Sequence, residues 1–242
     1  MQQTQQIYEY ILKISEIIQE TPLVKVFRIE LPKDTEINFY PGQFFMVSFV
    51  NDPEIKTSRA YSIASSPLNK GYLEIALDKV GPFTTKLFAM KEGDFLKFKG
   101  PYGKFYFSEE MKNNLVLIAG GTGITPLMGI IRYCNDKKSS NKIKFIYSVR
   151  TPHDIIYKDE LEKIKKSNLD FDYIVTVTRP NSEHDWKGRI GRINEDLLKQ
   201  NIKDIEGSLC FLCGPKEFVH SIVEVLESLG AKKEQIKTDV WG

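Results

Sequence analysis

Leu115-Val116-Leu117-Ile118-Ala119 is an unbroken apolar run, and Gly120-Gly121-Thr122-Gly123-Ile124-Thr125-Pro126 follows it directly. The run is typical of a strand buried on both faces of a parallel sheet. Glycines after such a strand let the backbone approach a pyrophosphate, and the N–H groups at the start of the next helix face the anion. Pro126 suits the first turn of that helix, where its missing N–H is not needed. The pattern predicts a dinucleotide-binding turn; the alternative is a tight turn without a ligand.

Strands and helices alternate along the rest of the chain. Apolar runs predict buried strands, and amphipathic stretches between them predict helices. The predicted elements after residue 119 are helix 126–135, strand 144–149, helix 157–167, strand 173–178, helix 194–200, strand 208–213 and helix 215–229. This alternation is typical of an α/β domain with a parallel sheet.

The first half of the chain has a different pattern. Short strand-like runs at 24–31, 44–50, 72–77 and 95–98 surround one short predicted helix at 84–90. Many short strands with a single helix favour a small antiparallel β-barrel. The sequence therefore predicts two domains, a barrel over residues 1–110 and an α/β domain over residues 111–242, divided within the polar stretch 108–113.

Composition argues against several classes of protein. The net charge is only +2, and nucleic-acid binding requires clustered basic charge. No apolar run approaches the roughly 18–20 residues of a membrane span, and the N-terminus lacks a secretory pattern. Three cysteines do not suit a disulfide framework and favour a reducing compartment. We expect a cytoplasmic protein.

Arg59-Ala60-Tyr61-Ser62 is the first candidate binding motif of the barrel. An arginine can bind a phosphate through charge-assisted hydrogen bonds. Tyr61 lies two residues along the same strand and projects on the same side as Arg59. The Ser62 hydroxyl can donate to a ring nitrogen or accept from it. Alone, this string is as well explained by an ordinary strand with a surface arginine.

Gly81-Pro82-Phe83-Thr84-Thr85-Lys86-Leu87 is the second barrel motif. It places two hydroxyls at the start of a short helix, where the helix dipole favours an anion. The alternative is a threonine N-cap, and both readings can hold at once.

Two further features belong to the α/β domain. The strand after the glycine-rich turn ends at Arg150, where an acidic residue would usually hold a ribose hydroxyl. Arg150 can face a 2′-phosphate or pair with Asp154, so the preference between NADH and NADPH stays open. Cys210 and Cys213 are spaced as a metal or redox pair, but residues three apart on a strand point to opposite faces. We therefore expect Cys210 in the core and Cys213 at the ligand-binding edge.

These motifs, in this order, resemble those of the ferredoxin–NADP reductase superfamily of flavin-dependent reductases. The resemblance runs from the opening strands (8–31) and Pro41-Gly42-Gln43-Phe44 to Thr238-Asp239-Val240-Trp241-Gly242. It implies an FAD-binding barrel, with FMN the less favoured flavin, and an NAD(P)H-binding α/β domain.

The resemblance also implies roles for individual residues. In the barrel, Arg59 would hold the flavin phosphate, Tyr61 would lie against the isoalloxazine and Ser62 would hydrogen-bond near N5. The residues implied at the FAD pyrophosphate are Gly81, Phe83, Thr84 and Thr85. Gly120 to Pro126 would cradle the nucleotide, and Cys213, Gly214 and Pro215 would lie beside the nicotinamide. Trp241 would cover the flavin ring; its alternative role is packing between the domains.

By the same resemblance, electrons pass from NAD(P)H through FAD to a separate acceptor, a ferredoxin or flavodoxin. Three alternatives remain: reduction of small acceptors such as ferric chelates or free flavin, service as the reductase component of a larger oxygenase or reductase, and a binding module without catalysis. Neither end of the chain carries a ferredoxin-like cysteine set, so a one-electron acceptor must be a separate molecule.

Overall fold

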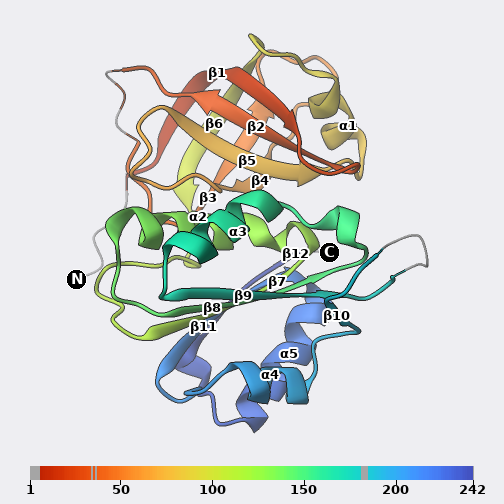
Figure 1. Ribbon diagram of the computed structural model, residues 1–242. Coiled ribbons are helices and arrows are strands. Elements are labelled where there is room, and N and C mark those ends of the chain that lie inside the picture. Colours follow the sequence, from red (N-terminus) through yellow and green to blue (C-terminus); the bar gives the residue numbers. More distant parts are fainter. Residues whose placement is uncertain (1–5, 34, 36, 181–184, 242) are drawn as a thin grey trace.

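The computed structural model describes residues 6–33, 35, 37–180 and 185–241. Figure 1 shows a β-barrel on one side and an α/β layer on the other. The barrel strands are β1 (Tyr8–Gln19), β2 (Val24–Glu30), β3 (Phe44–Phe49), β4 (Arg59–Ser62), β5 (Tyr72–Asp78) and β6 (Phe95–Tyr102). They pair antiparallel in the order β4-β3-β6-β1-β2-β5. The Ala64 N–H, just after β4, donates to the Glu74 carbonyl of β5 at 2.8 Å and nearly closes the barrel.

The barrel interior is filled by large aromatic side chains. Phe27, Phe45 and Phe98 are fully buried, and the rings of Phe45 and Phe98 lie 6.4 Å apart. Gly100 is required beside them, because a Cβ there would lie 2.7 Å from the Phe45 ring. Helix α1 (Pro82–Ala89) packs on this core through its buried Phe83 and Leu87. This close side-chain packing holds β3 in a fixed position. Because β4 pairs with β3, the position of β4 is fixed as well.

The second domain is a parallel sheet between two layers of helices. Its strands are β7 (Asn114–Gly120), β8 (Ile143–Val149), β9 (Phe171–Val177), β10 (Arg189–Ile190), β11 (Ser208–Pro215) and β12 (Ile236–Trp241). Their order is β10-β9-β8-β7-β11-β12, with every pair parallel. The helices are α2 (Ile124–Lys137), α3 (Lys158–Ser167), α4 (Glu195–Asn201) and α5 (Lys216–Ser228). Helices α2 and α3 lie between the sheet and the barrel, and α4 and α5 cover the other face (Figure 1).

The predicted fold class is confirmed: an antiparallel barrel precedes a parallel α/β sheet. Most predicted elements are present with ends shifted by one to three residues. Strand β12 was not predicted, because its sequence Ile236–Trp241 has no apolar run and is half-exposed. It pairs on one side only, at the edge of the sheet. The predicted division at residues 110 and 111 falls in the connection between β6 and β7 and stays a prediction.

The two domains share a continuous apolar interface. One core cluster contains Val24, Val26 and Ala76 of the barrel together with Phe145 and Ile131 of the α/β domain. An interface of this kind favours a fixed arrangement of two domains over free hinge motion. No helix in the described ranges is long and apolar enough to cross a membrane.

Candidate functional site

The glycine-rich turn lies where the strand order of the parallel sheet reverses. β8 and β11 flank β7 on opposite sides, and the helices that follow β7 and β11 lie on opposite faces of the sheet, which makes the ends of these two strands a topological switch point. Open α/β sheets bind ligands in the crevice at such a point. The chain leaves β7 at Gly120, forms a 3-10 turn over Gly121–Gly123 and enters α2 at Ile124. The predicted strand–turn–helix is therefore present, with the helix starting two residues before Pro126.

Close packing explains the glycines of this turn. A Cβ at Gly123 would lie 2.2 Å from the carbonyl oxygen of Cys213, so no larger residue fits against the end of β11. Gly121 has a φ of +55°, and a Cβ there would meet open space. The turn is held by two side chains: the Tyr147 hydroxyl donates to the Gly121 carbonyl at 3.0 Å, and the Thr125 hydroxyl donates to the Thr122 carbonyl at 2.8 Å. The backbone of the turn is therefore fixed in shape and open to a ligand.

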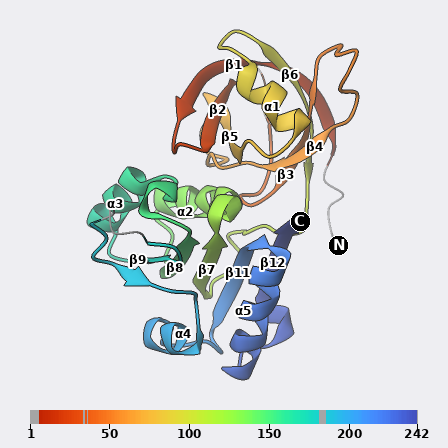
Figure 2. The ribbon, with the colours of Figure 1, turned by 90° about the vertical axis from the view of Figure 1, so that its right-hand side faces the viewer.

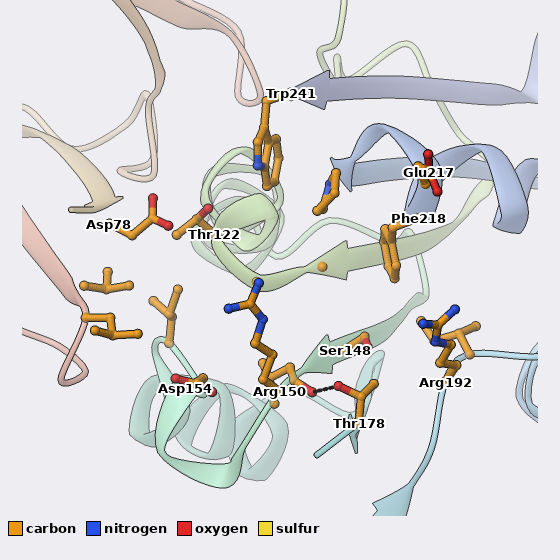
Figure 3. Close-up of a pocket in the computed structure, with 18 of the residues that line it drawn as sticks. Asp78, Thr122, Ser148, Arg150, Asp154, Thr178, Arg192, Glu217, Phe218 and Trp241 are labelled. Atoms are coloured by element: carbon orange, nitrogen blue, oxygen red, sulfur yellow. Dashed lines mark hydrogen bonds between the residues drawn. The ribbon is translucent and has the colours of Figure 1, made fainter. Parts of the chain in front are cut away.

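A cavity of about 600 Å³ opens in front of the turn, within the usual size range of small-molecule sites. Both domains line it: Thr21, Leu23, Val24 and Asp78 come from the barrel, and the remaining lining residues come from the α/β domain. Figure 3 shows its polar and aromatic lining, which includes Thr122, Ser148, Arg150, Thr178, Arg192, Glu217, Phe218 and Trp241. Asp154 also lines the cavity, but its carboxylate accepts from the Thr151 N–H and hydroxyl, both at 2.8 Å.

Arg150 extends toward the middle of this cavity (Figure 3). Within the described ranges it forms no ion pair, and the alternative pairing with Asp154 is not formed. Arg192 is a second cation on the cavity wall that the sequence reasoning missed, because it lies in the irregular segment between β10 and α4. In the part of the chain that the structure describes, neither Arg150 nor Arg192 forms an ion pair, so this wall is suited to an anionic group.

The end of β11 brings Cys213 to the turn. Cys213 is 1% exposed and packs with the core on the α2 side, whereas Cys210 packs with the opposite core. The two cysteines therefore face opposite sides of the sheet, as predicted. The Cys213 thiol donates to Oδ2 of Asp239 at 3.7 Å. Burial raises the pKa of the Cys213 thiol well above its usual value and also raises the pKa of Asp239, so the thiol is neutral at physiological pH.

Strand β12 supplies two residues to the same edge of the sheet. In its register Asp239 lies opposite Cys213, and Trp241 lies opposite Pro215. A Cβ on Gly123 would lie 2.7 Å from the Trp241 ring, so the indole rests on the glycine-rich turn while 39% of the residue stays exposed. Sequence reasoning selected Trp241 but missed Asp239, whose partner is 26 residues away and whose strand has no apolar signal.

On the barrel side, β4 and α1 bring the predicted flavin residues together. The Tyr61 ring lies 6.1 Å from the Phe83 ring, and the Arg59 guanidinium lies 5.9 Å from the Phe83 centroid. Burial raises the pKa of Tyr61 to about 12, so its hydroxyl stays protonated. Arg59 is exposed, and its one hydrogen bond within the described ranges goes to the adjacent Ser58 carbonyl. The guanidinium is thus available to a ligand.

The start of α1 has Gly81 as its N-cap, so the threonine N-cap expected as an alternative is not formed. The Thr84 hydroxyl accepts from the N–H groups of Val80 (2.8 Å) and Gly81 (3.1 Å), so this hydroxyl stabilises the turn itself. Thr85 is exposed, and a Cβ on Gly81 would meet no atom within 4 Å. The space above Gly81 therefore admits a ligand beside Arg59 and Phe83. A phosphate-bearing aromatic cofactor fits this surface, with a ring face, a free cation and the positive end of a helix side by side.

Comparison with known proteins identifies both halves of the chain. Residues 11–107 match the oxidoreductase FAD-binding domain family, and residues 117–224 match the oxidoreductase NAD-binding domain family. The chain belongs to the ferredoxin–NADP reductase superfamily. The two matched families are FAD-binding and NAD-binding domains of oxidoreductases, which gives FAD and NAD(P)H as the cofactors of the two domains.

Named members of the superfamily show how far the similarity extends. The chain is 29% identical over 215 residues to one component of the Na(+)-translocating NADH-quinone reductase of Marinomonas sp., covering 83% of this chain and 52% of that protein. It is 28% identical over 236 residues to NADH-cytochrome b5 reductase 1 of Aspergillus clavatus, covering 93% and 75%. The ferredoxin reductase in carbazole 1,9a-dioxygenase superimposes with a TM-score of 0.86 at 25% identity, covering 99% of this chain and 71% of that one. The chain thus spans about half the length of the quinone-reductase component.

Proposed function

We propose that this protein takes hydride from NADH at the glycine-rich turn and delivers electrons, one at a time, from FAD to a separate protein carrier of the ferredoxin or flavodoxin class. The observation that carries this proposal is the shared crevice. The cavity in front of Gly121–Gly123 has walls from both domains, and the strand carrying Tyr61 and Ser62 faces the same interface. FAD, when bound, supplies the conversion of a two-electron hydride donor into one-electron steps.

The chain's own residues would position the two cofactors. On the barrel, Arg59 would bind phosphate through charge-assisted hydrogen bonds, and the half-buried Tyr61 would offer a ring face, with the buried Phe83 packed near it. Ser62 makes no hydrogen bond through its hydroxyl within the described ranges, so this hydroxyl is available to donate to the reacting ring nitrogen. On the α/β side, the N–H groups of the glycine-rich turn would bind the nucleotide pyrophosphate.

Cys213 and Trp241 would complete the nicotinamide side. Cys213 carries a buried neutral thiol near the end of β11, and Pro215, two residues further along this strand, lines the cavity; Gly214 lies between them. Trp241 rests on Gly123 with part of its ring exposed, so the indole would close the crevice against water until a nicotinamide takes its place. A dry, enclosed crevice strengthens the electrostatic interactions of every group inside it.

NADH is the proposed donor because two of the similar proteins carry NADH in their names. Arg150 and Arg192 are the residues on which binding of NADPH would depend, since both line the cavity without an acidic partner. The deciding experiment is an anaerobic titration of the purified, FAD-loaded protein with each nucleotide in turn. Rapid loss of the flavin band near ~450 nm with NADH alone supports the proposal. A protein that binds FAD but is reduced by neither nucleotide would contradict it.

A second candidate, reductase component of an oxygenase, is favoured by the structural match to the ferredoxin reductase in carbazole 1,9a-dioxygenase. The two candidates differ in the acceptor and not in the site. Steady-state rates with a ferredoxin, a flavodoxin, a terminal oxygenase component and ferric citrate separate them. Fast turnover with the ferredoxin or flavodoxin supports the first proposal, and fast turnover with the oxygenase component alone supports the second. Fast turnover with ferric citrate alone would replace both by a small-acceptor reductase.

A further inference from the structure

Helix α2 joins the nucleotide side of the crevice to the flavin side. It begins at the glycine-rich turn and runs beneath the barrel (Figures 1 and 2). Midway along it, a Cβ on Gly129 would lie 2.6 Å from the carbonyl oxygen of Ile63, the residue that directly follows Ser62. Only glycine allows the helix to lie this close to the strand that carries Tyr61 and Ser62.

Arg132 lies three residues further on α2, so it projects on the same side as Gly129. Its Nη1 donates to the Ala64 carbonyl at 2.9 Å and to Oε1 of Glu74 at 2.6 Å, both in the barrel. Its Nε and Nη2 donate to the two carboxylate oxygens of Glu160 on α3, at 2.7 and 2.6 Å. One guanidinium therefore binds the segment after β4, strand β5 and helix α3 together.

Glu74 is the barrel's counterpart to Arg132. Its side chain is 1% exposed, and besides Arg132 it accepts from Nε of Arg28 at 3.1 Å and from the Tyr157 hydroxyl at 2.9 Å. The Tyr157 N–H also donates to Oε1 of Glu20 at 2.6 Å. The α/β domain is thus attached to the barrel by several directional, mostly buried polar contacts.

These contacts do something that the apolar interface cannot. Apolar burial is non-directional. The hydrogen bonds from Nη1 of Arg132 to Ala64 and Glu74 constrain distance and orientation across the interface, and the bidentate pair with Glu160 fixes the guanidinium on the α/β domain. Hydride transfer requires reacting atoms about 3–3.5 Å apart, and a displacement of about 1 Å can slow such a step about 100-fold.

We propose that Gly129 and Arg132 are positioning residues: α2, held against Ile63, Ala64 and Glu74, sets the spacing between the glycine-rich turn and the strand carrying Tyr61 and Ser62. The importance of that spacing for catalysis rests on the proposed hydride transfer. The existence of the spacing does not depend on the proposed function, and the spacing can be measured separately.

The first test inserts a methyl group at the contact. Gly129→Ala should slow single-turnover flavin reduction by NADH at least tenfold, while the Kd for NAD+ and the FAD content stay within about twofold of wild type. The matched control is Gly71→Ala in the barrel, where a Cβ would lie 3.4 Å from Oδ1 of Asn69 and away from the interface. Reduction of Gly129→Ala at the wild-type rate would overturn the proposal.

The second test uses the two carboxylates that share Arg132. Glu74→Gln removes the charge partner across the domain interface, and Glu160→Gln removes the partner within the α/β domain. We expect Glu74→Gln to slow flavin reduction about tenfold and Glu160→Gln to leave it within about twofold. Arg132→Lys keeps the charge but has one nitrogen for all four acceptors, so it should resemble Glu74→Gln. Equal effects of the two glutamine variants would overturn the role of Arg132. If Gly129→Ala does not fold, the comparison of Glu74→Gln with Glu160→Gln tests the positioning role in its place.

A structural readout separates failure of this inference from failure of the proposed function. Amide hydrogen exchange of the apoprotein should rise in Glu74→Gln at residues 59–65 and 124–132 relative to Glu160→Gln. If wild type is not reduced by any nucleotide, the proposed function fails, and exchange alone tests the spacing. Unchanged exchange at 59–65 in Glu74→Gln would then overturn the positioning role.

Discussion

The glycine-rich turn and the surface formed by β4 and α1 are built by different means. At the turn the backbone forms the candidate nucleotide site: Gly121–Gly123 is held by Tyr147 and Thr125 and packed against Cys213. On the candidate flavin side, exposed or half-exposed side chains on β4 and α1 form the surface, and within the described ranges the Arg59 guanidinium donates only to its neighbour's carbonyl. A backbone site is built into the fold, so damage to it unfolds the protein. A side-chain site can be altered without changing the fold.

The largest effect should come from filling the backbone site. Gly123→Ala places a Cβ 2.2 Å from the Cys213 carbonyl oxygen, and overpacking of this kind costs about 3 kcal/mol or more. We expect a large fall in the free energy of unfolding and loss of NADH binding, measured by urea unfolding and by equilibrium titration. The matched control is Gly121→Ala, which meets open space at φ +55° and should cost only about 1–2 kcal/mol. Equal free energies of unfolding of Gly123→Ala and Gly121→Ala would contradict the view that the packing of this turn is built into the fold.

Removing the flavin-side cation should have the next largest effect. Arg59→Ala should raise the Kd for FAD roughly 10–100-fold, since a charge-assisted bond contributes about 1.5–3 kcal/mol. The apoprotein should unfold within about 0.5 kcal/mol of wild type, because Arg59 is exposed. Arg150→Ala is the reciprocal variant, and it should leave FAD binding unchanged while weakening nucleotide binding. Loss of FAD affinity in Arg150→Ala would show that FAD binding and nucleotide binding do not depend on separate sets of residues.

The Ser62 hydroxyl should affect rate more than binding. Ser62→Ala should slow flavin reduction by about tenfold, because the variant cannot donate to the ring nitrogen, while the Kd for NADH stays unchanged. Anaerobic stopped-flow absorbance measures the rate, and Ser58→Ala, on the preceding loop, is the control. If the flavin of Ser62→Ala is reduced at the wild-type rate, the Ser62 hydroxyl does not have this role.

The smallest effect should be a change in pH dependence at Asp239. Burial raises the pKa of Asp239 in the folded protein. Its contribution to the free energy of unfolding is therefore fully present below the pKa of an unfolded Asp, about 3.9, and is lost as the pH rises through the higher pKa of the folded state. Asp239→Asn stays neutral and should lack this loss. The variant should gain on the order of 1 kcal/mol or less relative to wild type between pH 4 and pH 7, measured by urea unfolding at several pH values. If the difference in the free energy of unfolding between Asp239→Asn and wild type is the same at every pH from 4 to 7, the raised pKa of Asp239 is contradicted.

Local patterns predicted the parts of the site that local physics builds. The apolar run before Gly120 and the helix after it sufficed to predict a strand–turn–helix, and the alternation that follows predicted a parallel sheet. Arg59, Tyr61 and Phe83 were selected from two short motifs, and the structure brings them together because α1 packs on the barrel wall beside β4. Their roles toward FAD remain predictions, as do those of Ser62 and Thr85.

Residues that act through distant partners were missed. Asp239 lies 26 residues from Cys213, on an edge strand without an apolar signal, and Arg192 belongs to a connection of irregular structure. Gly129 reads in the sequence as a helix-weakening residue, and Arg132 reads as an ordinary surface cation. Neither has a nearby sequence neighbour that explains it.

The sequence by itself determined the two-domain fold class and the strand–turn–helix at Gly120–Pro126, because hydrophobic period, glycine placement and helix starts are properties of contiguous residues. Only the tertiary structure decided how the two sides face each other. The contacts between Arg132 and Glu74, 58 residues apart, and between Gly129 and Ile63 form when helix and barrel pack. Their geometry depends on the packing of whole elements, so no local pattern records it.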